Sequence, residues 1–85
     1  MNITEFERML KVKRDFEEKL NLDRPLEAYG VIVDPDDVYK AIRDYTKEEL
    51  SLLASWYKYR GQKHGNPAQI MVSVILKYKI QENGT

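Results

Sequence analysis

Two prolines that each follow a helix-capping side chain divide this chain more sharply than any other feature. Asp34 precedes Pro35, and Asn66 precedes Pro67. An Asp or Asn side chain can accept a hydrogen bond from a free backbone N–H at the start of a helix. Proline is favoured at the first helical position, because it has no N–H to leave unpaired. We therefore expect helices to begin at residues 35 and 67.

The helix that begins at Pro35 has an apolar face and is followed at once by another helix. Thr46 and Glu49 form a capping box, in which each side chain can bond the other residue's backbone N–H. Helices over 35–45 and 47–60 follow. The apolar face of the first has the spacing i, i+3, i+4 and i+7 and comprises Val38, Ala41, Ile42 and Tyr45.

The 47–60 helix has two apolar stripes rather than one, which predicts that it packs against neighbours on two sides. Gly61 is its expected stop, because glycine readily adopts the left-handed conformation that ends helices. One stripe consists of Leu50, Leu53, Ala54 and Tyr57. The other consists of Leu52, Trp56 and Tyr59.

An amphipathic helix is predicted at residues 4–21. Thr4 is its expected N-cap, and Pro25 steers the chain out of the helical conformation just beyond its end. Its apolar residues recur at intervals of three and four and are Phe6, Met9, Val12, Phe16 and Leu20.

Residues 70–80 allow two interpretations. With period two, alternate residues from Ile70 to Ile80 form one apolar face, which is typical of a strand that could pair with 31–33. We favour a buried central helix over 67–81, because it explains the Asn-Pro start. The helix places Ser73 and Lys77 on an exposed polar line with Gln69 and Gln81, and it buries Met71, Val74, Ile75 and Tyr78 together.

The predicted fold is therefore an all-α bundle of four helices (4–21, 35–45, 47–60 and 67–81) in a single domain, 1–85. The alternative is an α+β fold with strands at 31–33 and 70–80. A chain of 85 residues forms a small core, and without cysteine it has no disulfide to stabilise it. Self-association is therefore expected to supply further stability.

The charges balance but are unevenly distributed. There are eight basic and eleven acidic side chains up to Tyr45, and six basic and three acidic ones from Thr46 onward. Only the second part favours an anionic partner. The acidic amino-terminal sequence is unlike a signal peptide, and the apolar run from Ile70 to Leu76 is far shorter than the ~20 residues of a membrane span. A cytoplasmic protein is expected.

No catalytic residue, metal ligand or cofactor site is predicted. His64 is the only imidazole, and it follows a helix in a glycine-containing loop, where solvation is the usual role. Asp34, Asp36 and Asp37 resemble part of a calcium loop, but a helix start already explains all three. An enzyme would have to rely on ordinary Asp, Glu and Tyr side chains.

The segment 56–66 is the candidate binding surface, because it interleaves aromatic with basic side chains and ends in a flexible loop. Such a composition suits single-stranded nucleic acid or a protein surface. The competing interpretation is structural, since cations also stabilise the last turn of a helix. The candidate binding residues are Trp56, Tyr57, Lys58, Tyr59, Arg60, Lys63 and His64.

The leading functional hypothesis is a small non-enzymatic interaction module that acts as a regulator or inhibitor by binding a protein partner or itself. It follows from the excess of apolar positions in the last two helices, because exposed apolar surface marks interfaces. The alternative is nucleic-acid binding through 56–66. In format, the chain is similar to small phage-encoded and bacterial regulatory proteins.

Overall fold

Four α-helices account for most of the chain, whose computed structural model describes residues 2–83. Residues 2–83 contain no strand, so the all-α prediction is confirmed and the α+β alternative is wrong. The helices are α1 (Ile3–Leu20), α2 (Pro35–Ala41), α3 (Lys47–His64) and α4 (Pro67–Asn83).

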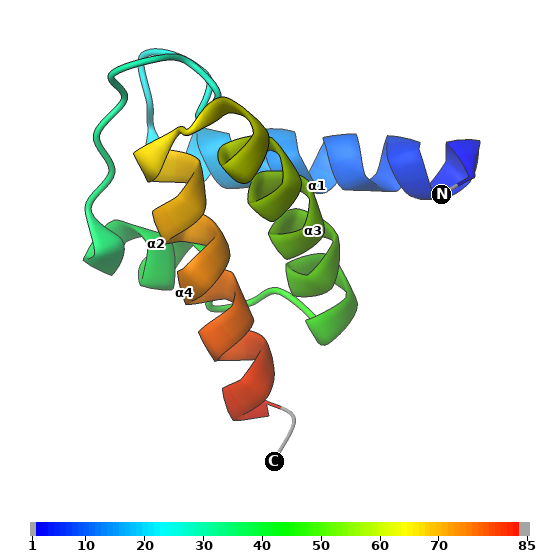
Figure 1. Ribbon diagram of the computed structural model, residues 1–85. Coiled ribbons are helices and arrows are strands. Elements are labelled where there is room, and N and C mark those ends of the chain that lie inside the picture. The colour runs from blue at the N-terminus through cyan, green and yellow to red at the C-terminus, as the bar shows by residue number, and fades with distance from the viewer. Residues whose placement is uncertain (1, 84–85) are drawn as a thin grey trace.

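Helices α3 and α4 form an antiparallel hairpin, and α1 lies across it while the short α2 packs against α4 (Figure 1). The hairpin turn is short because Gly65 adopts the left-handed conformation, with φ of 60°. The backbone N–H of Asn66 then donates to the Gly61 carbonyl over 3.0 Å, which closes the end of α3. The next helix begins immediately afterwards.

The core lies where α1, α2 and the hairpin meet, and the loop between α1 and α2 adds Leu26 and Val33 to it. The rings of Phe16 and Tyr57 pack at a centroid distance of 5.9 Å. Apolar side chains that are fully buried there are Phe16, Leu26, Val38, Ile42, Leu50, Leu53, Tyr57, Val72 and Leu76.

Helix α1 begins earlier than predicted. Asn2, rather than Thr4, is the N-cap, and its side-chain oxygen accepts a hydrogen bond of 2.8 Å from the backbone N–H of Glu5. Asparagine is the better cap of the two because its carbonyl oxygen reaches the third N–H of the helix readily. Asn21 ends the helix in the left-handed conformation, with φ of 54°.

The predicted end of α3 at Gly61 is wrong, because the helix continues to His64. Gly61 instead allows α4 to approach closely. A Cβ atom at this position would lie 3.1 Å from the Cβ of Gln69 and 3.1 Å from the backbone nitrogen of Ile70. Gly61 is therefore a contact residue between two helices. Gly65, and not Gly61, caps the end of α3.

Helix α2 is shorter than the predicted 35–45 and ends at Ala41. A tighter turn follows, in which the backbone N–H of Tyr45 donates to the Ile42 carbonyl over 3.1 Å. The shortening follows from the next helix, since Thr46 has to be extended in order to cap α3. The predicted inner face still points inward, with Val38, Ala41 and Ile42 buried.

Helix α4 is rotated relative to the prediction. Gln69 and Ser73, assigned to the exposed line, are buried, whereas Val74 and Tyr78, assigned to the core, are 61% and 59% exposed. The predicted burial of Ile75 is correct. The contact at Gly61 and the position of Asn66 fix the rotation of the helix. Its inner face is therefore Ala68, Gln69, Val72, Ser73, Ile75 and Leu76.

Candidate functional site

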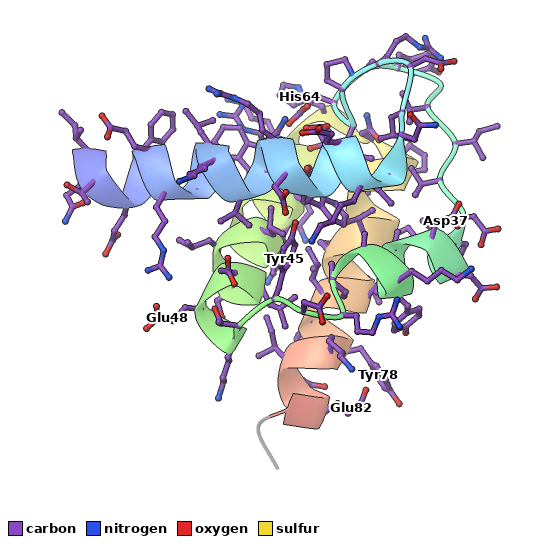
Figure 2. All side chains as sticks on the ribbon, turned by 180° about the vertical axis from the view of Figure 1, so that it is seen from behind. Asp37, Tyr45, Glu48, His64, Tyr78 and Glu82 are labelled. Carbon is purple, nitrogen blue, oxygen red and sulfur yellow. The ribbon has the colours of Figure 1, made fainter. Side chains whose placement is uncertain are left out.

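Residues 56–64 of the candidate segment 56–66 lie within α3, and their side chains point in different directions. The segment does not end in the expected loop, because Gly65 caps α3 and Asn66 is buried. Tyr57 is fully buried in the core. Trp56 and Arg60 are half-buried, and Tyr59 is 65% exposed. Lys58 faces the groove that α3 forms with α4. His64 is exposed at the last turn of α3, at the opposite end of the hairpin from Tyr78 (Figure 2).

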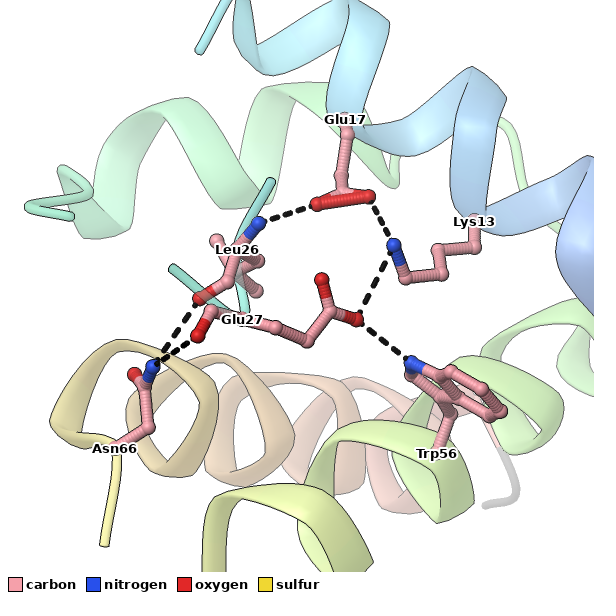
Figure 3. A network of polar contacts seen from close by, with 6 residues as sticks. All are labelled: Lys13, Glu17, Leu26, Glu27, Trp56 and Asn66. Atoms are coloured by element: carbon pink, nitrogen blue, oxygen red, sulfur yellow. Dashed lines mark hydrogen bonds and ion pairs between the residues drawn. The ribbon is translucent and has the colours of Figure 1, made fainter. Parts of the chain in front are cut away.

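Trp56 belongs to a polar network that joins α3 to α1 and to the loop between α1 and α2 (Figure 3). Its indole N–H donates to a carboxylate oxygen of Glu27 over 2.9 Å. Lys13 lies 3.1 Å from that same oxygen and also pairs with Glu17. The second Glu17 oxygen accepts the backbone N–H of Leu26. One face of α1 is thereby linked to both Trp56 and the loop.

The Glu27 carboxylate remains charged within this network. Burial acts to raise its pKa, but the hydrogen bond from Trp56 and the charge of Lys13 outweigh burial and lower the pKa below its ordinary value. A charged Glu27 accepts stronger hydrogen bonds than a neutral one. The network therefore holds the Trp56 ring in place.

The Trp56 ring is also covered by neighbouring side chains. The Arg60 guanidinium lies 3.6 Å from its centroid, in a cation–π contact, and the Phe6 ring packs at 6.1 Å. Trp56 consequently has little free surface on which a nucleobase could stack. Tyr59 is the exposed ring of the segment, and the Lys63 ammonium lies 5.8 Å from its centroid.

A second surface, missed by sequence reasoning, is the groove between α3 and α4. Ile70 and Val74 are its partly exposed apolar residues, and Tyr78 continues this exposed line one turn further along α4. Its volume is about 260 Å³. The groove is lined by Ala54, Ser55, Lys58, Gln62, Ile70, Ser73, Val74, Lys77 and Ile80.

The sequence did contain a signal for this groove. The apolar excess of the last two helices was interpreted as the sign of an interface, but Val74 and Tyr78 were assigned to the core of a central helix. Since α4 is buried on one face only, Ile70, Val74 and Tyr78 are exposed. The excess marked a surface.

The cations near the groove lack carboxylate partners. The ion pairs of residues 2–83 involve Arg8, Lys13, Lys19 and Lys79. Within that part of the chain, none involves Lys58 or Lys77, and no acidic residue lines the groove. Arg60 and Lys63 likewise contact rings rather than carboxylates.

The acidic cluster at 34–37 has a structural role. An Asp34 side-chain oxygen accepts the backbone N–H of Asp36 over 2.9 Å and so caps α2. Over residues 2–83, no group of three or more His, Asp or Glu side chains is placed to hold a metal ion. In the same region, no helix combines the length and apolarity needed to cross a membrane.

Comparisons of the chain with models of protein families, with curated proteins and with solved structures found no match. The features of the chain that bear on its function are therefore the two surfaces of α3, one around Trp56 and one along α4.

Proposed function

We propose that this protein is a non-enzymatic interaction module that binds a segment of another protein in the groove between α3 and α4. The observation that supports this proposal most is the exposed apolar line of Ile70 and Val74 beside two cations, Lys58 and Lys77, that form no ion pair within residues 2–83. A regulator or inhibitor that acts by occupying its partner would need no more than such a surface.

The energetics of exposure support this proposal. Fully burying the side chain of a valine or isoleucine contributes roughly 1.5–3 kcal/mol to the free energy of binding. Val74 is 61% exposed in the free chain, so much of that contribution is still to be gained on binding. Unpaired lysines beside the apolar line would add steering and specificity, since complementary charge favours one class of partner over others.

A site-specific crosslink tests the proposal directly. A photoreactive phenylalanine analogue in place of Val74 would be introduced in cells of the protein's source, and the crosslinked protein identified by mass spectrometry. The matched control carries the same analogue at Arg14, which is exposed on α1. We expect a protein that is crosslinked from position 74 and not from position 14.

The purified partner then has to bind the intact chain. We expect calorimetry to show binding to the unmodified protein and a loss of at least tenfold in affinity for Val74→Glu. Equal crosslinking from positions 74 and 14, or equal affinity for Val74→Glu, would overturn the proposal.

Nucleic-acid binding through 56–66 is the second candidate, favoured by the Arg60 and Lys63 side chains that contact no carboxylate within residues 2–83. Its weakness is that Trp56 is covered and Tyr57 is buried, which leaves Tyr59 as the ring for stacking. Titration of labelled oligonucleotides at low and moderate salt tests it, because phosphate contacts weaken steeply with salt. Binding that Arg60→Ala/Lys63→Ala removes would support this candidate, and no binding at low salt would eliminate it.

A further inference from the structure

The shape of the groove limits what can occupy it. Since α3 and α4 are antiparallel, the groove follows both axes, from Ile70 and Gln62 at one end to Ile80 and Ala54 at the other. The ten steps from Ile70 to Ile80 rise by about 15 Å along α4, at about 1.5 Å per residue. A segment of roughly three helical turns has this length.

Three common ways of recognising a protein segment differ in the surface that they need. Addition of a strand needs an exposed sheet edge, and residues 2–83 form no sheet. A polyproline segment docks into an aromatic-lined groove, whereas no aromatic side chain lines this groove within the described chain. An amphipathic helix needs an apolar groove between helices, which is the surface present here.

The small side chains that line the groove favour a helix further. Ala54, Ser55 and Ser73 allow the backbone of an incoming helix to come close. Ser73 is already satisfied, because its hydroxyl donates to the Ile70 carbonyl over 2.7 Å. It therefore places no unpaired polar group beneath the partner's apolar face.

The charge of the groove defines the partner more narrowly. Lys58 projects from α3 and Lys77 from α4, so cations approach from both helices. A symmetric dimer of this chain across the groove would bring two pairs of lysines together without a carboxylate. Charge complementarity thus favours an acidic partner over a second copy.

Resting on the proposed function, we infer that the α3–α4 groove binds an acidic amphipathic helix of a partner protein. The helix packs its apolar face on Ile70, Val74 and Ile80. Its flanking carboxylates pair with Lys58 and Lys77.

The test uses two synthetic helical peptides of 15 residues that share an apolar stripe at i, i+3, i+4 and i+7. One carries Glu beside the stripe and the other carries Lys. Fluorescence anisotropy with the full chain should give a Kd at least tenfold lower for the Glu peptide. That preference should fall as salt rises.

Two double variants locate the binding charge. Lys58→Glu/Lys77→Glu should abolish or reverse the preference, while Lys11→Glu/Arg14→Glu, which makes the same change of charge on exposed α1 positions, should leave it intact. Val74→Glu should lower the affinity of the protein for both peptides. All these positions are exposed, so we expect each variant to fold, and circular dichroism checks this.

The outcomes separate this inference from the proposed function. The inference of an acidic helix would be overturned if the Lys peptide bound equally or more tightly. It would also be overturned if neither peptide bound in a way that depends on Val74. The crosslinked partner could still depend on Val74 in that case, so the proposed function would stand. A dimer in sedimentation analysis that Val74→Glu dissociates would show that the occupant is a second copy and would overturn the inference as well.

Discussion

The side-chain nitrogen of Asn66 lies 3.3 Å from the backbone carbonyl oxygen of Leu26, forty residues earlier in the chain. The same nitrogen is 3.3 Å from the Glu27 carbonyl, while the Asn66 side-chain oxygen accepts the backbone N–H of Gln69 over 3.1 Å. One buried amide therefore caps α4 and attaches it to the loop between α1 and α2.

Substitutions at Asn66 should separate these two roles. Asn66→Asp keeps the cap but directs a carboxylate oxygen at two carbonyls, so we expect a loss of about 1–3 kcal/mol in the free energy of unfolding. Asn66→Ala loses both roles and should cost at least as much. In urea denaturation, Asn2→Asp is the control, because that cap is exposed and should change stability by less than about 0.5 kcal/mol. If Asn66→Asp were as stable as the wild type, the contact of Asn66 with the Leu26 and Glu27 carbonyls would not contribute to stability.

Gly61 should tolerate no branched side chain. Gly61→Val would place methyl groups where even a Cβ atom lies 3.1 Å from Gln69 and Ile70, so we expect a loss of about 1–3 kcal/mol from overpacking. Lys63→Val introduces the same side chain on an exposed part of α3, without a close contact to α4, and should lose much less. Thermal unfolding of both variants measures the difference. Similar melting temperatures would show that the helices can move apart.

The buried hydroxyl of Tyr57 should be dispensable. It has no hydrogen-bond partner in the described chain, and burial raises the pKa of its phenol, so it is neutral at physiological pH. Tyr57→Phe should therefore leave the free energy of unfolding unchanged or raise it by up to about 1 kcal/mol. The matched variant Tyr45→Phe loses the hydrogen bond to Asp15 and should be destabilised by about 1 kcal/mol. Denaturant titration distinguishes the two variants, and a large loss for Tyr57→Phe would reveal a partner.

Glu27 should make stability depend on pH. Its pKa in the folded state is lower than the ordinary value of 4.5, so its contribution is present above about pH 4.5 and is lost as the pH falls through the lower folded value. Glu27→Gln should lose about 1 kcal/mol at pH 7 and differ less from the wild type in acid. The fluorescence of Trp56, the only tryptophan, reports unfolding at each pH.

The control for this prediction is Glu18→Gln, which removes one carboxylate from an exposed position on α1. Other acid-sensitive contacts, such as that of Asp15, are present in the wild type and in both variants, so their effects cancel in the comparison. A difference between Glu27→Gln and wild type that stays constant from pH 7 to pH 3 would contradict the assigned pKa direction.

Local signals predicted the elements of this fold well. The caps at Asp34, Thr46 and Asn66 each act within one turn of helix, so the sequence around them is sufficient to place a helix start. Gly61 shows where local reasoning fails. The same residue can end a helix or admit a neighbouring one, and the choice depends on α4, which packs against it.

The candidate site was less predictable because it depends on the rotation of α4. The spacing of apolar residues indicated the apolar faces of this helix, including Val74 and Tyr78. It could not show which of these faces would pack against the rest of the protein. Contacts of Gly61 and Asn66 with distant segments make that selection. Likewise, Phe6 packs on Trp56 and Glu27 accepts its N–H, and neither residue is near Trp56 in sequence. Arg60, four residues further along α3, contacts the ring locally.

The short turn at Gly65 also bears on the order of folding. Contacts between α3 and α4 close small loops, whereas those of α1 with Trp56 and of Leu26 with Asn66 enclose much longer ones, whose closure costs more entropy. We therefore expect the hairpin to form early and α1 to dock late. Since the groove is built from α3 and α4, it belongs to the early-forming unit, and transient detachment of α1 would leave it in place.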